Sequence, residues 1–320
     1  MKKKILLLLL LLILLETGCS NGKSNKISNA DNKNNEAYYT FTDSLGNSVI
    51  LKTRPERVIS LEGSYAEIWI LAGGEVIGVT DDVIQEGRLE VSDEINIVGT
   101  VKNPNIEEIL SLSPDFILLS PDIENHLKIA DILKDANIAH AYFKVEYFED
   151  YLNMLDICTD ITGNKDLYEE HGLKVKNDIE SILSKIEYDS SYKPEVLFIR
   201  AFSSGAKAKK DDNLTCKILE DLGTVNIASK HPSLLEELSI EKIIEEDPDF
   251  IFVTTMGNTE KAIEALKNGI ERNPAWSNLS AVKNNRYIIL PKELFHYKPN
   301  AKWGESYKFL AEIIYPEIFN

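Results

Sequence analysis

Hydrophobic and polar positions follow the same order twice in this chain. Residues 105–119 read NIEEILSLSPDFILL and residues 239–253 read SIEKIIEEDPDFIFV, and the two segments align without a gap at an offset of 134 residues. Each begins with apolar residues at helical spacing, continues with a Pro-Asp pair that ends the helix, and finishes with the apolar run of a strand buried on both faces. One unit repeated so far apart predicts two similar lobes rather than a solenoid, whose repeats recur every 20–50 residues or so.

Strands and helices alternate around both copies of this unit. In the first lobe we expect a β-hairpin at residues 38–56, then strand 57–61, helix 64–72 with Ser64 as its N-cap, strand 75–80, helix 106–112, strand 116–120, helix 124–136 and strand 139–143. In the second lobe we expect strand 196–200, helix 214–222, the second repeat helix, strand 250–255, helix 259–268, strand 286–290 and helix 302–314. This alternation predicts an α/β fold in which two Rossmann-like lobes have parallel sheets flanked by helices.

The segment between the lobes has a different pattern. Residues 147–186 contain no proline and no clear strand, and they read as helical almost throughout, with Gly163 and Gly172 as interruptions. A long helical connection would hold the two lobes at a nearly fixed distance. The expected organisation is an N-terminal α/β lobe over residues 38–146, a long linking helix over residues 147–191 and a C-terminal α/β lobe over residues 192–320.

The N-terminus has the pattern of a secretory signal. Three lysines precede an apolar run at residues 5–15, which is shorter than the roughly 20 residues of a membrane span. The small-small-Cys sequence that follows resembles the bacterial lipobox, although Glu16 stands where leucine is usual. We therefore expect a lipoprotein signal peptide over residues 1–18, lipidation of Cys19, and a disordered tether over residues 19–37, where there is almost nothing to bury. The alternative is a secreted protein in which Cys19 is incidental.

Composition limits the partners. The formal net charge is −17, and it falls to −19 when residues 1–18, which carry three lysines and one glutamate, are removed. Binding to nucleic-acid phosphates or to an anionic membrane surface needs clustered Lys and Arg, so we expect no nucleic-acid partner and contact with the membrane only through a lipid anchor.

Cys158 and Cys216 lie in two different expected helices without CxxC spacing, which favours buried thiols over a metal or redox site.

Several segments, taken in order, carry a family resemblance. RVISL is followed by SYAEI, NPNIEEI and PDFIL, and LFHYKPNAKWGESY comes near the C-terminus. This order is similar to that of the helical-backbone (class III) substrate-binding proteins of ABC importers, which take up ferric siderophores, haem and vitamin B12. The resemblance covers nearly all of the chain after the signal. It implies a receptor on the extracytoplasmic face of the cell membrane that captures a metal chelate between two lobes and delivers it to a permease with its ATPase.

The resemblance also implies a role for the repeated glutamates. In the family, one acidic residue on each lobe projects toward the permease and pairs with its arginines. By position in the repeated unit, those residues are Glu107 and Glu241. Arginine binds a carboxylate in a bidentate way, and two such contacts on equivalent lobe surfaces would fix the orientation of the complex. The alternative is that each glutamate only favours the first turn of its own helix through the helix dipole.

We expect the ligand site in the cleft between the lobes, because open parallel sheets bind ligands beyond the carboxyl ends of their strands. The main candidates at strand ends and in the late loop are Ser64, Tyr65, Tyr142, Lys144, Arg200, Phe202, Met256, His296, Tyr297 and Lys298. Further candidates are Asp81, Asp82, Ser120, Phe143, Ser203, Ser204 and Phe295. Aromatic side chains mixed with cations suit a bulky, flat or anionic chelate.

Two of these candidates have specific expected roles, each with an alternative. Arg200 ends a buried strand and needs a counter-charge, which is either an oxygen of the ligand or an internal ion pair. His296 or Met256 is a candidate axial ligand to the metal of a bound chelate, and packing is the alternative for the histidine.

Two other classes of protein remain as alternatives. A receptor for free zinc or manganese would need several convergent histidine and carboxylate ligands. The five histidines, at positions 126, 140, 171, 231 and 296, include no pair at ligand spacing. A secreted enzyme is less favoured, because the sequence has no G-x-S-x-G, no Gly-rich phosphate loop and no HExxH. We expect no enzyme activity and no cofactor, and the bound ligand is expected to be a metal chelate.

Overall fold

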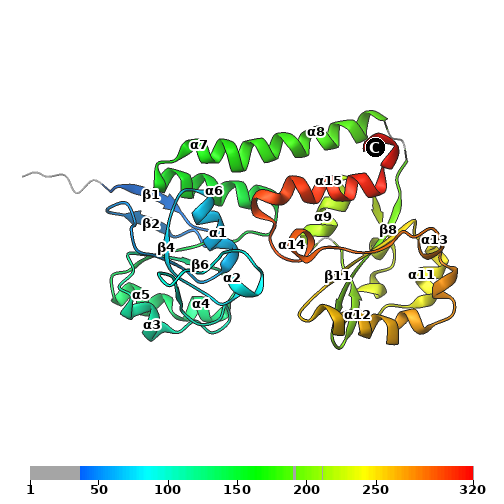
Figure 1. The fold of residues 1–320 in the computed structure, drawn as a ribbon, viewed down its shortest axis with the longest axis horizontal. Coiled ribbons are helices and arrows are strands. Elements are labelled where there is room, and N and C mark those ends of the chain that lie inside the picture. Colours follow the sequence, from blue (N-terminus) through cyan, green and yellow to red (C-terminus); the bar gives the residue numbers. More distant parts are fainter. Residues whose placement is uncertain (1–36, 190–191, 211, 320) are drawn as a thin grey trace, which may run out of the picture. The chain divides into compact units, whose positions relative to one another are not determined.

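The computed structural model describes residues 37–189, 192–210 and 212–319. The expected signal peptide, Cys19 and nearly all of the expected tether lie outside these residues. Residues 37–320 group into one compact unit, in which two separate sheets with flanking helices form two lobes (Figure 1). The prediction of an α/β fold with parallel sheets flanked by helices is confirmed. No helix in the described part of the chain has the length and apolar character needed to span a bilayer.

The N-terminal lobe contains a parallel sheet in the order β5-β4-β3-β6-β7. Its strands are β3 (Val58–Ser60), β4 (Val76–Val79), β5 (Asn96–Ile97), β6 (Phe116–Leu119) and β7 (Ala139–Tyr142). Its helices are α1 (Gly63–Leu71), α2 (Asp82–Gln85), α3 (Ile106–Ser111), α4 (Glu124–Lys128) and α5 (Ala130–Asp135). An antiparallel hairpin of β1 (Tyr39–Thr42) and β2 (Ser48–Leu51) precedes the sheet, as the sequence predicts. The helix expected at residues 124–136 is instead two short helices that meet at Ile129.

Alternate residues of the central strand β6 face two hydrophobic cores. Phe116 and Leu118 pack on the side of α1, whereas Ile117 and Leu119 pack with Ile109 of α3. All four residues of β6 are buried, which explains its uninterrupted apolar run. Helices therefore cover both faces of this sheet, and the carboxyl ends of its strands are left to the loops.

The C-terminal lobe has the strand order β10-β8-β11-β12, with β9 paired to β8 in the antiparallel sense. Its strands are β8 (Glu195–Phe202), β9 (Gly205–Ala208), β10 (Val225–Asn226), β11 (Phe250–Thr255) and β12 (Tyr287–Ile289). Its helices include α9 (Leu214–Asp221), α10 (Ile227–Lys230), α11 (Ile240–Glu246), α12 (Thr259–Asn268), α13 (Ser280–Lys283) and α14 (Lys292–Phe295). Because β8 continues past Arg200 into a hairpin with β9, Phe202 lies within the strand rather than in a loop after it.

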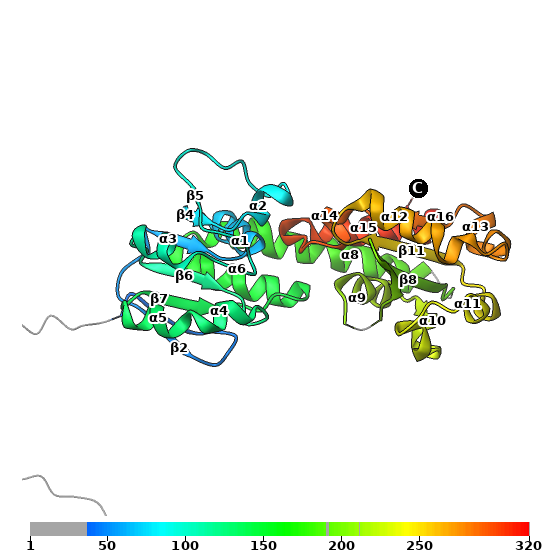
Figure 2. The same cartoon turned by 90° about the horizontal axis from the view of Figure 1, so that it is seen from below.

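The connection between the lobes is two helical segments rather than one. Helix α6 (Phe148–Thr162) ends at Gly163, whose φ of 75° is left-handed. A second run then comprises α7 (Lys165–Tyr168), a π-helical turn (Glu169–Leu173) and α8 (Lys174–Asp189). Gly172 lies inside the π-helical turn and does not end the helix. Helix α15 (Trp303–Ile314) lies beside α8 in both views (Figures 1 and 2) and is followed by α16 (Pro316–Phe319).

Helix α1 begins one residue earlier than the sequence suggests. Its N-cap is Glu62, in an extended conformation, and Gly63 is its first residue, so the prediction of Ser64 as N-cap is wrong. The Ser64 side chain is instead inside the first turn, and its hydroxyl donates to Oε1 of Glu62 at 3.0 Å. This shift brings the Glu62 carboxylate to the carboxyl end of β3.

Candidate functional site

A cavity of about 300 Å³ lies at the carboxyl ends of the N-terminal sheet and is lined from both lobes. The N-terminal lobe contributes Glu62, Ser64, Asp82, Glu86, Arg88, Asp122, Val145, Glu146 and Tyr147. The loop before α9 contributes Asp212 and Asn213, helix α9 begins with Leu214, and the loop after α14 contributes His296, Tyr297 and Lys298. Parallel sheets bring such loops together at one edge, so this cavity is the candidate ligand site.

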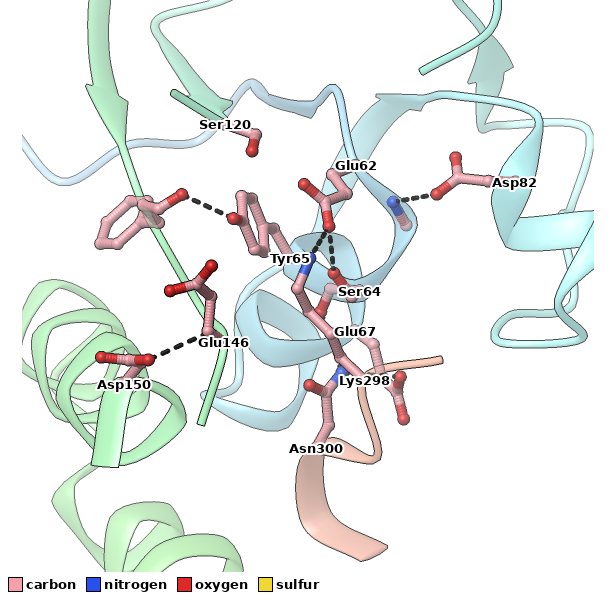
Figure 3. Close-up of polar contacts among 12 residues, drawn as sticks. Glu62, Ser64, Tyr65, Glu67, Asp82, Ser120, Glu146, Asp150, Lys298 and Asn300 are labelled. Atoms are coloured by element: carbon pink, nitrogen blue, oxygen red, sulfur yellow. Dashed lines mark hydrogen bonds and ion pairs between the residues drawn. The ribbon is translucent and has the colours of Figure 1, made fainter. Parts of the chain in front are cut away.

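Glu62 lines the cavity and lies among Ser64, Ser120 and Lys298 (Figure 3). Its carboxylate accepts a hydrogen bond from the hydroxyl of Ser64 and forms an ion pair with the ammonium group of Lys298. Burial alone would raise the pKa of Glu62, but Lys298, together with hydrogen bonds from serine hydroxyls, outweighs burial and holds that pKa below its usual value. Glu62 is therefore ionised at neutral pH and already has a cationic partner.

Asp82 is held against the start of α1. Its carboxylate accepts from the backbone N–H of Gly63 at 2.6 Å and from the hydroxyl of Thr80 at 2.6 Å. A Cβ at position 63 would lie 2.8 Å from Oδ2 of Asp82, so only glycine permits this approach. Burial raises the pKa of Asp82, which the hydrogen bonds only partly offset.

Arg88 is enclosed by carboxylates. Its side chain is 7% exposed, and its guanidinium group lies 2.6 Å from Glu67 and 2.5 Å from Glu86. It also donates to the backbone carbonyl of Lys298 at 3.1 Å. Burial alone would lower the pKa of Arg88, but the two carboxylates raise it above its usual value. Its charge is thus neutralised within the protein.

The segment after α14 is attached to the N-terminal lobe by a buried asparagine. Asn300 is fully buried, and its side-chain amide donates to the carbonyl of Ser64 at 3.0 Å and to Glu67 at 2.8 Å. Together with the Glu62–Lys298 ion pair, these bonds join the late loop to α1. We call Glu62, Glu67, Arg88, Lys298 and Asn300 the cross-lobe network, because α14 itself packs against strand β11 of the C-terminal lobe.

Five of the ten main candidates lie at the cavity. Ser64, His296, Tyr297 and Lys298 line it. Lys144 lies at its edge, where its ammonium group is 3.2 Å from Glu146 and 3.9 Å from Asp122. These side chains stay ligand-site candidates on grounds of position.

Tyr65 and Tyr142 lie in the core and do not line the cavity. The hydroxyl of Tyr65 donates to the carbonyl of Phe143 at 2.5 Å, and the hydroxyl of Tyr142 donates to the carbonyl of His126 at 3.1 Å. Both side chains are almost completely buried. The early start of α1 turns Tyr65 toward the sheet, and the last residue of β7 faces the core that contains Ile109.

Arg200 lies near His296, and of the two only His296 lines the cavity. The Nε atom of Arg200 and the Nδ1 atom of His296 are buried, and neither has a hydrogen-bond partner among the described residues. Burial lowers the pKa of Arg200, and the negative charge of Asp212 opposes this effect. Burial and then the positive charges of Arg200 and Lys292 lower the pKa of His296 to about 4, so its imidazole is neutral at neutral pH.

Phe202 and Met256 are at the ends of β8 and β11 but are not among the residues that line the cavity. Met256 is exposed.

Within the described ranges, no group of three or more His, Cys, Asp or Glu side chains is arranged to hold a metal ion. Cys158 and Cys216 are both buried, in α6 and α9.

Sequence reasoning missed most of the acidic wall. The residues that line the cavity but were not among the expected candidates include Glu62, Glu86, Arg88, Asp122, Glu146, Asp212 and Asn213. A signal was available for some of them, since Glu62, Asp122 and Glu146 each follow a strand within a few residues.

Glu107 and Glu241 occupy the first turns of α3 and α11, and both are exposed. The side chain of Asn105 accepts from the backbone N–H of Glu107 at 3.1 Å, and the hydroxyl of Ser239 donates to the carboxylate of Glu241 at 2.9 Å. Hydrogen bonds from its own backbone N–H and from Ser239 lower the pKa of Glu241. Both positions are compatible with docking and with a stabilising effect on the helix.

Comparisons with known proteins concern the family and the fold. A family model described as periplasmic binding protein matches residues 58–294. The chain is 26% identical to YvrC of Bacillus subtilis, an uncharacterised ABC transporter substrate-binding lipoprotein, over 94% of this chain and 93% of that one. It is 29% identical to YfmC of the same bacterium, an Fe(3+)-citrate-binding protein, over 85% and 84%. The fold resembles that of PiuA from Streptococcus pneumoniae, an iron uptake ABC transporter substrate-binding protein, with a TM-score of 0.67 at 21% identity over 88% and 98%.

Proposed function

This chain belongs to the periplasmic binding protein family, and we propose that it captures an iron complex or a corrinoid outside the cytoplasm and delivers it to an ABC importer. The observation that carries the proposal is the cavity at the strand ends, which is lined from both lobes. The description of YfmC as an Fe(3+)-citrate-binding protein supports an iron complex, either a ferric siderophore or haem. The family resemblance of the sequence keeps a corrinoid within the proposal.

Ligand capture in this proposal depends on side chains from both lobes. Tyr297 offers an aromatic face, with the Arg88 guanidinium 5.9 Å from its ring centre. Ser64 and His296 add polar groups. The cross-lobe network would keep the lobes close to their present positions, because opening the cavity widely would separate the buried pair Glu62–Lys298. Binding is therefore expected with a small movement of the lobes.

A fluorescence titration tests the proposal. The full-length protein in detergent is titrated with ferric citrate, a ferric tris-catecholate, a ferric tris-hydroxamate, haem and cobalamin. Saturable binding of one of these at a single site, with the chelate recovered unchanged, is the expected result. Tyr297→Ala should weaken that binding at least tenfold, whereas Tyr38→Ala, on the distant hairpin, should not. Binding of none of the five would overturn the proposal.

Docking to the permease is proposed for Glu107 and Glu241. The double variant Glu107→Ala/Glu241→Ala should retain ligand affinity and lose most uptake into cells, because both exposed carboxylates would no longer pair with arginines of the permease. Glu108→Ala/Glu245→Ala changes neighbouring acids on the same two helices and is the matched control. Loss of ligand affinity in the first variant would instead place the glutamates in the ligand site.

The anchor is proposed to be a lipid on Cys19. The description of YvrC as a lipoprotein supports this assignment. Cys19→Ala should release the protein into the soluble fraction and abolish its labelling by radioactive palmitate. Membrane retention unchanged in that variant would contradict the anchor and leave the binding proposal intact.

A further inference from the structure

The cavity carries an excess of negative charge. Six carboxylate side chains and two cationic side chains line it, and acids come from both lobes. The six are Glu62, Asp82, Glu86, Asp122, Glu146 and Asp212, and the two cations are Arg88 and Lys298. A site for a polyanionic chelate would be expected to have the opposite balance.

Both cations already have partners within the protein. Arg88 is 2.6 Å from Glu67 and 2.5 Å from Glu86, and Lys298 forms an ion pair with Glu62. An anionic ligand could recruit either one only by breaking an ion pair in a largely buried place, which would leave a carboxylate without a counter-charge. Neither cation is therefore available to attract a negatively charged ligand.

Three of the six acids are exposed, and each pairs only with a partly exposed lysine, a kind of ion pair that contributes little. Asp122 and Glu146 share the exposed ammonium group of Lys144, at 3.9 and 3.2 Å, and their side chains are 53% and 51% exposed. Asp212, on the opposite lobe, is 67% exposed and pairs with Lys209. A positive group that entered between the two lobes would meet carboxylates on both sides.

His296 lines the cavity, and Arg200 lies close enough to His296 to lower its pKa but is not among the lining residues. Nε of Arg200 and Nδ1 of His296 lack partners within the described part of the chain, and a buried polar atom without a partner costs free energy. Oxygen atoms of a chelate could accept from the guanidinium group. The neutral imidazole could donate or accept a hydrogen bond. Hydrogen-bond donors of the C-terminal lobe and the exposed carboxylates would together orient a ligand that has both oxygen acceptors and a cationic group.

We propose, building on the proposed function, that the natural ligand is a metal chelate bearing at least one ammonium group, which lies between Asp122, Glu146 and Asp212. A polyanionic complex such as ferric citrate is then a poor ligand, in contrast to the description of the relative YfmC. The proposal concerns the charge of the ligand and does not depend on the identity of its metal.

A matched pair of ligands tests this charge preference. The full-length protein in detergent is titrated with ferrioxamine B, a ferric hydroxamate with one ammonium group, and with its N-acetyl derivative, which is neutral but otherwise alike. Ferric citrate and a ferric tris-catecholate serve as polyanionic probes. Ferrioxamine B should bind at least tenfold more tightly than its acetylated form and than both anions, and its affinity should fall with added salt because exposed charges are screened.

Two protein variants complete the test. Asp122→Asn/Glu146→Gln should remove most of the preference for the ammonium form, whereas Asp131→Asn/Asp135→Asn, on α5, should leave it unchanged. Equal affinity for the two hydroxamates, or tighter binding of a polyanion, would overturn the charge inference while leaving the proposed function standing. Absence of binding by every chelate, haem and cobalamin included, would remove both.

Discussion

Asp115 and Asp249 occupy equivalent positions in the two copies of the repeated unit and make equivalent hydrogen bonds. The Asp115 carboxylate accepts from the backbone N–H groups of Glu56 and Arg57, at 2.8 and 3.0 Å, just before β3. Asp249 accepts from the backbone N–H of Glu195, at 2.9 Å, at the start of β8. Each aspartate thus ties the beginning of one central strand to the beginning of its neighbour, which explains why both copies contain it.

Replacement of either aspartate should destabilise the protein by a similar amount. Asp115→Ala removes two backbone hydrogen bonds, and Asp249→Ala removes one backbone hydrogen bond and one to the side chain of Tyr192, so we expect a loss of about 1–3 kcal/mol in the free energy of unfolding for each variant. Urea titrations of the two variants measure both values. Asp135→Ala, at an exposed position on α5, is the control and should change stability by less than about 0.5 kcal/mol. A loss in either variant no larger than that of the control would contradict this account.

The rest of the repeated unit also has structural explanations at most positions. Ile109 and Ile243 are buried, and the residues before each proline, Ser113 and Asp247, share a left-handed φ of 48° and 42°. These positions could be predicted as scaffold from the sequence, because helix packing, turn and buried strand each leave a local pattern. Glu107 and Glu241 leave no such pattern, since exposed side chains are not constrained by packing.

The linking segment shows what local patterns can and cannot predict about elements. Both Gly163 and Gly172 are visible in the sequence as interruptions, but only Gly163 ends a helix. The difference lies in backbone conformation. Gly163 has a left-handed φ with open space around its α-carbon, whereas Gly172 has helical geometry and packs within 3.2 Å of Leu152 and Tyr168 if a Cβ is added. A sequence shows the absence of a side chain but not the reason for it.

Alanine substitutions should distinguish the left-handed conformation of Gly163 from the close packing of Gly172. Gly163→Ala should destabilise the protein by about 1–2 kcal/mol, because a left-handed conformation is costly for alanine. Gly172→Ala should be close to neutral, since better helix propensity offsets a small adjustment of two flexible side chains. Thermal unfolding of both variants measures the difference. Gly163→Asn, which tolerates the left-handed region better, should recover part of the loss, and a neutral Gly163→Ala would refute this explanation.

At the scale of the whole molecule, the alternation of strands and helices was sufficient to predict the fold, but the wall of the candidate site was not predictable. The partners Glu62 and Lys298 are separated by 236 positions, and no local pattern connects them. Arg88 lies in a loop whose path the periodicity does not define, and its burial depends on Glu67 of α1 and Glu86. Ion pairs across the molecule depend on which loops meet in the folded chain. A single sequence contains no local pattern that specifies those meetings.

The cross-lobe network should contribute to stability as well as to the site. Lys298→Met leaves the buried carboxylate of Glu62 without its cationic partner, so we expect a loss of about 1–3 kcal/mol in the free energy of unfolding. Lys308→Met is the matched control, because its pair with Glu312, at 3.7 Å and with side chains 65% and 43% exposed, should contribute less than about 0.5 kcal/mol. Chemical denaturation measures both variants. Glu62→Gln/Lys298→Met should recover part of the loss, and similar losses for the two single lysine variants would contradict the assigned role.

The late position of Lys298 and Asn300 in the chain has a consequence for the order of assembly. The first lobe can form its sheet from residues synthesised early, but Glu62 and the carbonyl of Ser64 receive their partners only when residues 298–300 have emerged. Until then the acidic wall is open to water and the site is incomplete. A chain translocated from its N-terminus would therefore become able to bind only after residues 298–300 have crossed, when both lobes have begun to fold.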